Sequence, residues 1–383
     1  VSMRLLHPAE LGVEPGDAGN SSAALYVRNW STKDHAHIGN LETEMLLLDT
    51  GTHQFPVSVN RGDGIADNCY VVSPLAAYGA YAQEEVKRMN PPQLRRPLAW
   101  LLRGVSALLR SIHADRTVQI NNWLLSTNLY PDSWEGADLP EITALLAASF
   151  PQYTFTFRSL NPQCNGPLLM RLKALGYVSI PSRQVYIFDG RAGDEAAYRA
   201  RHDTRKDAAL LARSRYRVRR GDELQAEDFV RLEQLYNQLY LEKYCQLNPH
   251  YKAEWLRRGQ QEGWLQLRVL QSPEGRIDGV VGWFATEATL SAPIVGYDTA
   301  LPIKLGLYRQ LTQLCLQEAA ARRIVLNFSS GAPQFKRMRG GQPQIEVSMV
   351  YVKHLPWKNR IIWGLLGLLM RTIAAPVMKA LKV

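Results

Sequence analysis

The segment from Ile294 to Arg337 constrains the fold more than any other part of the chain. It begins with an apolar run that ends at Gly296-Tyr297-Asp298, and a turn containing Pro302 follows. Apolar residues then recur every three or four positions, as on the buried face of a helix: Leu307, Leu311, Leu314, Cys315 and Leu316. The run Ile324–Phe328 is β-branched and aromatic and has the length of a buried strand. The segment therefore predicts the order strand, turn, helix, strand.

The turn before this helix, Lys304-Leu305-Gly306, is the first candidate binding feature. If the two strands are parallel neighbours, the helix begins at the carboxyl edge of the sheet. Free backbone N–H groups and the helix dipole favour anions at such a position. We therefore expect an anionic ligand at this edge.

Length, charge and cysteine content narrow the class of protein. A chain of 383 residues predicts two domains. The four cysteines are scattered without a CxxC pair, which indicates reduced thiols in a cytosolic protein. The net charge of +10 favours an anionic partner, whether a nucleotide-bearing substrate, a carrier protein, RNA or a membrane surface. The chain has no HExxH, GxSxG or P-loop motif, and no metal site is expected.

The first half of the chain predicts a leader and one α/β unit. Residues 1–22 are expected to form the leader, and residues 23–190 the first domain. Strands are predicted at 23–30, in a hairpin over 42–59, and at 117–126, 153–160 and 183–188. Helices are predicted at 78–89, 94–112, 140–149 and 166–175.

The second half, residues 191–355, repeats a similar order after a turn-like cluster at 189–193. Its first segment, 198–220, has nine Arg or Lys residues against Asp203 and Asp207. That segment is interpreted as a solvated helix leading into a strand, or as a positive surface for phosphates, RNA or an acidic carrier. A helix is predicted at 228–245, and strands at 264–271, 277–286, 288–297 and 346–353.

Two motifs of this half carry a resemblance to a known family. Asp203-Thr204-Arg205-Lys206 resembles a helix entrance, and Phe328–Arg337 a chain ending, of the Fem-like subfamily of GNAT N-acyltransferases. The family ending is roughly F-D-F-x-x-G-x-x-x-Y-K, which Phe328, Gly331, Phe335, Lys336 and Arg337 match. Asn327 stands where the family usually has Asp, and Phe335 where it has Tyr. The resemblance covers residues 195–353, and residues 23–190 less specifically.

The resemblance implies an α/β (α+β) fold of tandem GNAT-like domains, each a mixed, mostly antiparallel sheet flanked by helices. It implies an N-acyltransferase that moves an acyl group from acyl-CoA or an acyl-carrier protein to an amine of a small or amino-acid-like acceptor. The residues expected to hold the donor are Gly296, Lys304, Leu305, Gly306, Leu307 and Tyr308. Those expected to bind the acceptor are Tyr240, Lys243, Tyr244, Asn248, Ser329, Phe335, Lys336 and Arg337.

Asp298, with Tyr297 beside it, is the expected catalytic pair. As the carboxylate at the functional edge of the sheet, Asp298 is interpreted as a general base or amine-orienting group, or else as a turn cap. The tyrosines of the acceptor set alternatively pack in the core, and Lys336 and Arg337 are alternatively exposed loop charges. Two other functions remain open: transfer from aminoacyl-tRNA, and a non-catalytic module that binds an acylated carrier or a membrane.

Residues 356–383 predict a basic amphipathic helix. No acidic residue follows Glu346, and the apolar run 361–370 has half the length needed to span a bilayer. We expect an interfacial helix anchored by Trp357 and Trp363, or docking of the helix on a partner or on the protein's own core. The expected location is cytoplasmic, with peripheral attachment to the inner face of the membrane.

Overall fold

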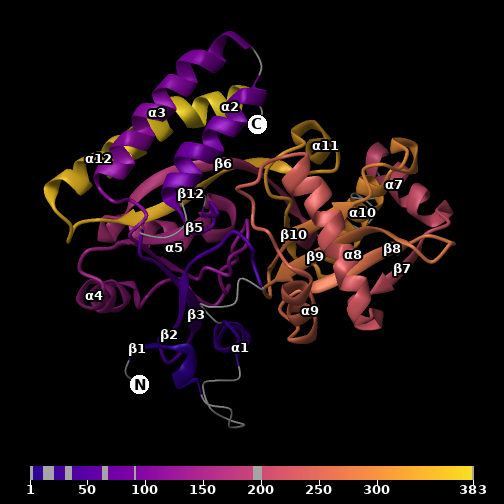
Figure 1. The fold of residues 1–383 in the computed structure, drawn as a ribbon, viewed down its shortest axis with the longest axis horizontal. Helices are drawn as coiled ribbons and strands as arrows, with labels where there is room; N and C mark the ends of the chain where they lie inside the picture. The colour runs from indigo at the N-terminus through magenta and orange to yellow at the C-terminus, as the bar shows by residue number, and fades with distance from the viewer. Residues whose placement is uncertain are drawn as a thin grey trace.

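The computed structural model describes residues 3–11, 21–30, 37–62, 68–89, 92–192 and 201–381. Half of the predicted leader and the first residues of the basic segment, 198–200, lie outside these ranges. The described chain forms a twelve-stranded mixed sheet with helices on both faces (Figure 1). The strand order is β1-β2-β3-β4-β5-β12-β6-β11-β10-β9-β8-β7.

The first half of the chain supplies one end of the sheet. Its strands are β1 (Arg4–Leu6), β2 (Glu44–Asp49), β3 (Gln54–Asn60), β4 (Thr117–Ile120), β5 (Thr154–Leu160) and β6 (Val178–Asp189). Its helices are α1 (Ser22–Arg28), η3 (Ala76–Tyr81), α2 (Ala82–Arg88), α3 (Arg95–Ser111), α4 (Leu139–Ser149) and α5 (Pro162–Leu175). Short 3₁₀ turns are η1 (Pro8–Glu10), η4 (Pro92–Leu94) and η5 (Gly190–Ala192).

The second half supplies the other end. Its strands are β7 (Arg217–Arg220), β8 (Gln266–Gln271), β9 (Ile277–Ala285), β10 (Thr289–Tyr297), β11 (Val325–Asn327) and β12 (Gln342–Tyr351). Its helices are α7 (His202–Arg213), α8 (Ala226–Asn237), η7 (Gln238–Glu242), α9 (Ala253–Gln261), α10 (Leu307–Arg322) and α11 (Pro333–Met338). Two 3₁₀ turns, η6 (Gly221–Glu223) and η8 (Ile303–Leu305), precede α8 and α10. The chain ends in α12 (Trp357–Leu369), η9 (Met370–Ala374) and α13 (Ala375–Leu381).

Strand β6 joins the two halves. Its residues Val178–Ile187 pair with β12, and Ile187–Asp189 pair antiparallel with β11. Strand β12, the last of the chain, lies between β5 and β6, within the part of the sheet built by the first half. The two halves therefore share one sheet, although chain order divides them near residue 190.

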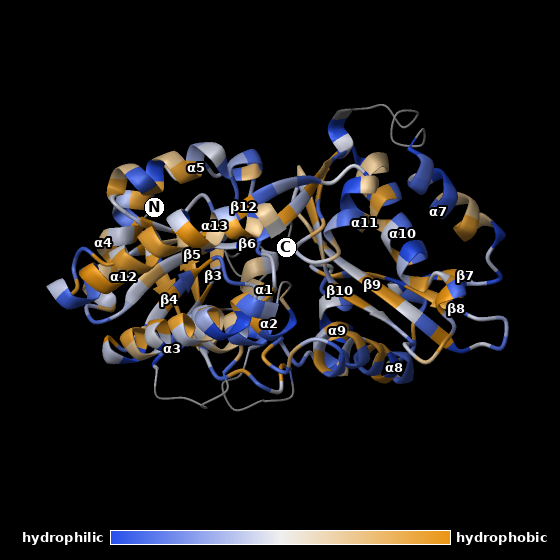
Figure 2. Ribbon diagram, turned by 90° about the horizontal axis from the view of Figure 1, so that it is seen from above, coloured by the Kyte–Doolittle hydropathy of each residue, from blue (hydrophilic) through white to orange (hydrophobic). Residues whose placement is uncertain are grey.

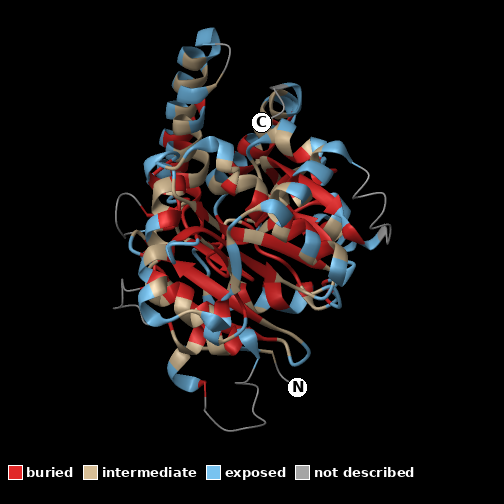
Figure 3. Ribbon diagram, turned by 90° about the vertical axis from the view of Figure 1, so that its right-hand side faces the viewer, coloured by how far each residue is buried: buried red, intermediate tan, exposed pale blue. Residues whose placement is uncertain are grey.

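Helices cover each face of both halves. In the first half, the neighbouring β12 residues Met349 and Val350 belong to different clusters, one under α4 and α5 and one under α3 and α12. In the second half, Val280 faces α8 and α9, and Val281 faces α10. Figure 2 shows the hydrophobic residues of the strands and helices, and Figure 3 shows buried strands between partly exposed helices. The mixed α/β class predicted from the sequence is confirmed.

Two predicted strands differ in the structure. Residues 23–30 were expected as a strand but form α1, because Ser21 caps the helix by accepting a hydrogen bond from the N–H of Ala24. The four buried residues of this helix, Ala23, Ala24, Tyr26 and Val27, have helical spacing. The strand predicted at 117–126 ends at Ile120, because Asn121 takes a left-handed backbone conformation with φ 55°.

The C-terminal helical segment is longer than expected. The stretch Trp357–Ala380 is helical over 24 residues with a mean hydropathy of 1.8, so by length and composition it suffices to cross a membrane. The expectation that this apolar segment is too short to span a bilayer is therefore wrong, because the helix has 24 residues. One face of α12 packs on the protein, where Trp363 is fully buried. Trp363 is thus a core residue and not the interfacial anchor that was predicted, whereas Trp357 is 67% exposed.

Candidate active site

Strands β10 and β11 run parallel and then diverge. They pair only from Thr289 to Ser291 on β10 and from Val325 to Asn327 on β11. A register irregularity follows Ser291, and from Ile294 onward β10 pairs with β9 alone. The carboxyl-terminal half of β10 therefore has no strand partner on its β11 side, and we call the region between the diverging strands the β10–β11 cleft. This is the edge at which the sequence predicted a ligand.

Lys336 lies buried at the mouth of this cleft. Its side chain is on α11, and its ammonium donates to the backbone carbonyls of Ser329 and Ser330, just beyond β11. Only 4% of the residue is exposed, and no carboxylate lies within ion-pair distance among the described residues. Burial, together with the nearby charge of Arg183, lowers the pKa of Lys336 to about 7. The interpretation of Lys336 as an exposed loop charge is wrong, because it is a buried lysine without a counterion among the described residues.

Arg183 and Glu346 form the opposite wall, and neither was singled out in the sequence. Arg183 Nε donates to Glu346 Oε1 at 2.8 Å. A terminal nitrogen of Arg183 also donates to the carbonyl of Ser126 and the hydroxyl of Thr127. The Thr127 hydroxyl in turn lies 3.5 Å from the hydroxyl of Ser329. The sequence held one signal for them: the predicted strands 183–188 and 346–353 begin with an arginine and a glutamate, which could pair across neighbouring strands.

Aromatic side chains from both halves line the cleft. Tyr308 on α10 lies between Tyr297 and Phe335, with ring centroids 6.2 and 4.9 Å away. Tyr240 packs against Tyr244 on the α8–η7 side. Burial, and then the proximity of Tyr308, raise the pKa of Tyr240. These five predicted site residues therefore come together around the mouth of the cleft.

The first half adds two further tyrosines that the sequence did not single out. Tyr70 and Tyr81 pack 4.9 Å apart, and both are partly exposed. Burial raises the pKa of Tyr70 to about 12, whereas the nearby charge of Arg183 acts to lower it. Burial also raises the pKa of Tyr81 well above its ordinary value. These two tyrosines are therefore neutral phenols, which donate hydrogen bonds but carry no charge at neutral pH.

A basic pocket of about 440 Å³ adjoins the cleft on the side of α7, α10 and α11. Its polar lining includes Lys206, Arg309 and Arg339. Fully buried Asp207 accepts a 2.6 Å hydrogen bond from Nε of each arginine, which fixes both guanidinium groups. Arg339 also lies 3.4 Å from the ring centre of Phe335. The basic helix predicted at 198–220 thus contributes Lys206, and also the carboxylate of Asp203, to the lining of this pocket.

Asp298 is engaged in structural contacts. Its Oδ1 accepts from the backbone N–H of Ala300, which caps the turn after β10, and its Oδ2 accepts from Arg231 at 2.7 Å. The side chain is 14% exposed. This geometry favours the capping interpretation, and the role of Asp298 in catalysis stays a prediction.

The predicted donor turn keeps its place at the start of α10. Gly306 has φ 62°, and a side chain there would lie 2.6 Å from Leu210 of α7. The backbone N–H groups of Leu307 and Tyr308 begin the helix, and the carbonyl of Leu305 accepts from Gln310. Lys304 is exposed. Gly296 has a packing role, because a Cβ there would lie 2.6 Å from the backbone of Leu235 and Tyr236 in α8.

The remaining acceptor residues divide into two groups. Lys243 is exposed, and the amide of Asn248 donates to the carbonyls of Tyr240 and Cys245, which holds the end of η7. Arg337 stacks on Tyr186, and its buried Nε has no hydrogen-bond partner among the described residues. Among the described residues, no group of three metal-ligating side chains occurs.

Comparisons with known proteins found similarity to solved structures only. No family model matches the chain, and no curated protein matches it. The structure is similar to FemX with 11% identity over 61% of this chain and 81% of FemX, at a TM-score of 0.48. It is also similar to L-PGS from Bacillus licheniformis, with 15% identity over 60% of this chain and 77% of that chain, at a TM-score of 0.42. A tandem GNAT protein from the clavulanic acid biosynthesis pathway shows 12% identity over 61% and 74%, at a TM-score of 0.35.

At these identities and TM-scores the likenesses carry no argument about activity. The order and pairing of the chain's own strands decide the fold: three antiparallel strands, a helix, and a parallel strand that diverges from its neighbour. That order is the one expected for the second GNAT-like unit. The resemblance drawn from the sequence is thus confirmed for the fold, and the function rests on the geometry of the cleft.

Proposed function

We propose that this protein is an N-acyltransferase that moves an acyl group from a thioester donor to an amine. The observation that carries the proposal is Lys336, a buried lysine without a counterion among the described residues, at the mouth of the β10–β11 cleft. An uncompensated buried charge is costly unless a ligand or transition state supplies the opposite charge. The attack of an amine on a thioester carbonyl creates such a charge on the carbonyl oxygen.

The donor enters along the unpaired edge of β10. An extended pantetheine arm has amide groups that can pair with a free strand edge, as an added strand does. The basic pocket beside the cleft then receives the phosphate groups at the other end of the donor. The N–H groups at the start of α10 lie between these two places and add to the attraction for phosphate. Coenzyme A and a phosphopantetheine-bearing carrier protein share this chemistry.

The chemical step needs positioning and charge stabilisation more than a covalent intermediate. The neutral amine attacks the carbonyl carbon, the carbon–nitrogen bond forms, and negative charge develops on the carbonyl oxygen. The Lys336 ammonium, which donates hydrogen bonds only to carbonyl oxygens in the structure, stabilises that charge. The carbon–sulfur bond then breaks, and the released thiol carries the proton lost by the amine.

The acceptor amine occupies the aromatic part of the cleft. Neutral Tyr240 and Tyr308 favour a hydrocarbon or aromatic body on the acceptor. The Arg183–Glu346 pair adds one polar wall whose charges already balance each other. We therefore expect a mostly apolar acceptor, with the amine directed toward Lys336.

The test is thiol release from acyl-CoA substrates of several chain lengths in the presence of a pool of amines. Wild-type protein is expected to release thiol only when an amine is present. Lys336→Met keeps the size of the side chain and removes its charge, and should lower turnover by at least about 100-fold. Lys173→Met, an exposed lysine on α5, is the matched control and should leave turnover unchanged. Thiol release that is equal in wild type and Lys336→Met would refute the proposal.

A parallel incubation with aminoacyl-tRNA tests the donor class. The positive α7–β7 segment would attract RNA through charge alone. Transfer to an amine that depends on tRNA, and that ribonuclease abolishes, would exclude a thioester as the donor. Transfer from acyl-CoA that ribonuclease leaves unchanged supports the proposal.

A further inference from the structure

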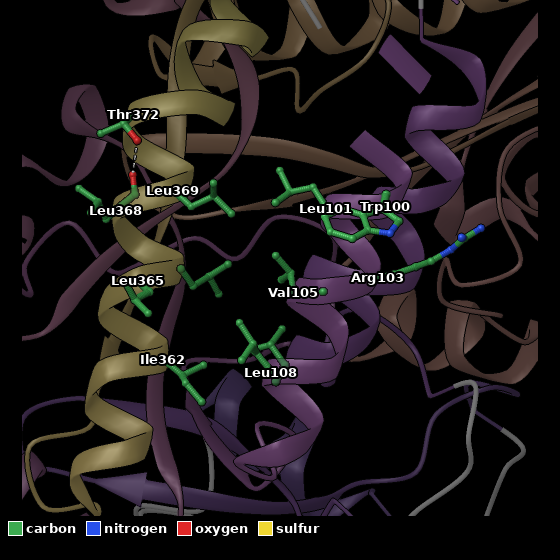
Figure 4. A pocket seen from close by; sticks show the side chains of 13 residues that line it. Trp100, Leu101, Arg103, Val105, Leu108, Ile362, Leu365, Leu368, Leu369 and Thr372 are labelled. Atoms are coloured by element: carbon green, nitrogen blue, oxygen red, sulfur yellow. Dashed lines mark hydrogen bonds between the residues drawn. The ribbon is translucent and has the colours of Figure 1, made fainter. Parts of the chain in front are cut away.

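Helices α3 and α12 lie side by side and present an apolar surface, which we call the α3–α12 surface (Figure 4). Four large apolar side chains that line it are exposed: Trp100, Leu108, Leu365 and Leu368. Trp100 is 77% exposed, which is unusual for the side chain with the most to gain from burial. Between the helices runs a groove of about 720 Å³. Contiguous apolar surface of this kind on a folded protein indicates a docking site.

These exposed side chains do not mean that α3 and α12 are poorly packed on the protein. Beneath the exposed residues, both helices are buried in one cluster that includes Val105, Leu109, Ile362, Trp363 and Leu366, and all of these except Trp363 also form the floor of the groove. Each helix therefore has two apolar faces, one packed on the sheet and one turned outward. The outward faces are the ones that form the α3–α12 surface.

The charged residues around the α3–α12 surface indicate which kind of partner it binds. The chain has no acidic residue from position 86 to 114 or from position 347 to its end, so α3 and α12–α13 carry only basic charges. These basic residues are Arg95, Arg96, Arg103 and Arg110 on α3, and Lys358, Arg360, Arg371 and Lys379 on the C-terminal helices. An apolar surface among lysines and arginines complements a bilayer with anionic lipid headgroups. Trp357, which is 67% exposed at the start of α12, has the place of an interfacial tryptophan.

We propose that the α3–α12 surface docks this protein on an anionic membrane, with the apolar side chains of both helices inserted at the level of the acyl chains. The helices lie in the plane of the interface, because Trp363 and its neighbours hold α12 against the sheet. The groove between them accommodates a lipid chain. The membrane surface is therefore formed by two segments 250 residues apart in the sequence, of which only the C-terminal one was expected.

The docking surface connects to the cleft through η3. Tyr78 of η3 packs against the same buried cluster that supports α3 and α12. The pKa of Tyr78 is raised by burial and also by the charge of Glu346, which belongs to the wall of the cleft. A membrane-bound protein would thus have its cleft adjoining the lipid surface. An amphiphilic acceptor or product is the class of compound that this arrangement suits, and this part alone rests on the proposed function.

The test is co-sedimentation of the full chain with vesicles. Wild-type protein should pellet with phosphatidylcholine vesicles that contain phosphatidylglycerol, and should bind at least about tenfold more weakly to phosphatidylcholine alone, since each basic residue near an anionic surface adds about 1 kcal/mol. The variant Trp100→Glu/Leu365→Glu should lose at least about tenfold in binding, because it removes two inserted apolar groups. Leu368→Ser alone should give a smaller loss in the same direction.

The matched control is Met170→Glu on α5. Met170 is 67% exposed, like Trp357, but lies on the helix that packs against the other face of the sheet. This variant should bind anionic vesicles as the wild type does. Absence of wild-type binding to anionic vesicles would overturn the proposal. So would light scattering that shows a dimer that Trp100→Glu/Leu365→Glu dissociates, because the surface would then be covered by a second copy. The binding measurement needs no turnover, so it stays informative if the proposed function fails.

Discussion

The guanidinium group of Arg183 holds both carboxylate oxygens of Glu346, at 2.8 and 3.3 Å, across strands β6 and β12. The two residues are direct partners in the strand register, and a register irregularity follows Glu346. Their side chains are 21% and 4% exposed. The pair lies at the point where the last strand of the chain enters the part of the sheet made by the first half. It therefore contributes both to the join between the halves and to the wall of the cleft.

Glu346→Gln should destabilise the protein. The substitution keeps the shape of the side chain but leaves Arg183 without its counterion in a mostly buried position. Breaking such a pair costs about 3 kcal/mol, which corresponds to a fall in Tm of about 3–5 °C for a chain of this size. Differential scanning fluorimetry measures the shift. Asp222→Asn breaks a pair whose partners are 58% and 64% exposed, and should change Tm by less than about 1 °C. Equal shifts in the two variants would contradict a structural role for the buried pair.

Gly296→Ala should also destabilise the protein, for a steric reason. The added Cβ would lie 2.6 Å from the backbone of Leu235 and Tyr236, which cannot move without shifting α8 away from the sheet. Overpacking of this kind costs about 1–3 kcal/mol. Gly364→Ala in α12 meets nothing within 4 Å, and should instead stabilise the helix by about 0.5–1 kcal/mol. Chemical denaturation measures the free energy of unfolding, which should fall in Gly296→Ala and rise in Gly364→Ala. A stabilised Gly296→Ala would show that α8 does not approach the strand this closely.

Local patterns were sufficient to predict most of the elements. The strand, turn, helix and strand at 294–328 appear as β10, η8, α10 and β11, because apolar spacing and β-branched content reflect the local backbone directly. The parallel pairing of β10 and β11 was also anticipated. The helix at 22–28 was mistaken for a strand, because Ala23–Val27 is uniformly apolar over a short length and its Ser21 cap was not weighed.

Pairing over long distances in the chain was not predictable from local patterns. Nothing in the residues of β12 indicates that it lies between β5 and β6, about 180 residues earlier in the sequence. For the same reason Arg183 and Glu346 could not be identified as a pair. Phe335, Lys336 and Arg337 were found because a motif marked them, but the burial of Lys336 depends on packing that the motif does not encode. The outward face of α3 was missed because the helical period at 94–112 does not show which apolar residues pack on the sheet.

Asp298→Asn distinguishes a capping residue from a general base. An asparagine still accepts a hydrogen bond from the N–H of Ala300 but no longer forms an ion pair with Arg231. The geometry leads us to expect a Tm lower by about 1–2 °C and a turnover within about threefold of the wild type. The two readouts are thermal unfolding and thiol release from acyl-CoA. A fall in turnover of 100-fold with an unchanged Tm would instead make Asp298 the base that the sequence suggested.

The buried charge of Lys336 predicts how stability depends on pH. The pKa of Lys336 is about 7 in the folded protein, against an ordinary value of 10.5. Between these values the unfolded chain binds a proton that the folded protein does not, so the free energy of unfolding rises with pH across this window. The slope of the free energy of unfolding against pH is at most about 1.4 kcal/mol per pH unit. Below pH 7 both states are protonated, so the slope falls to zero and the destabilisation by the buried charge is fully present. Urea denaturation of the wild type and of Lys336→Met from pH 7 to 9.5 isolates it: the difference between the two proteins should narrow as the pH rises. A difference independent of pH would show that Lys336 keeps its charge throughout, and that its counterion comes from a group other than a bound substrate.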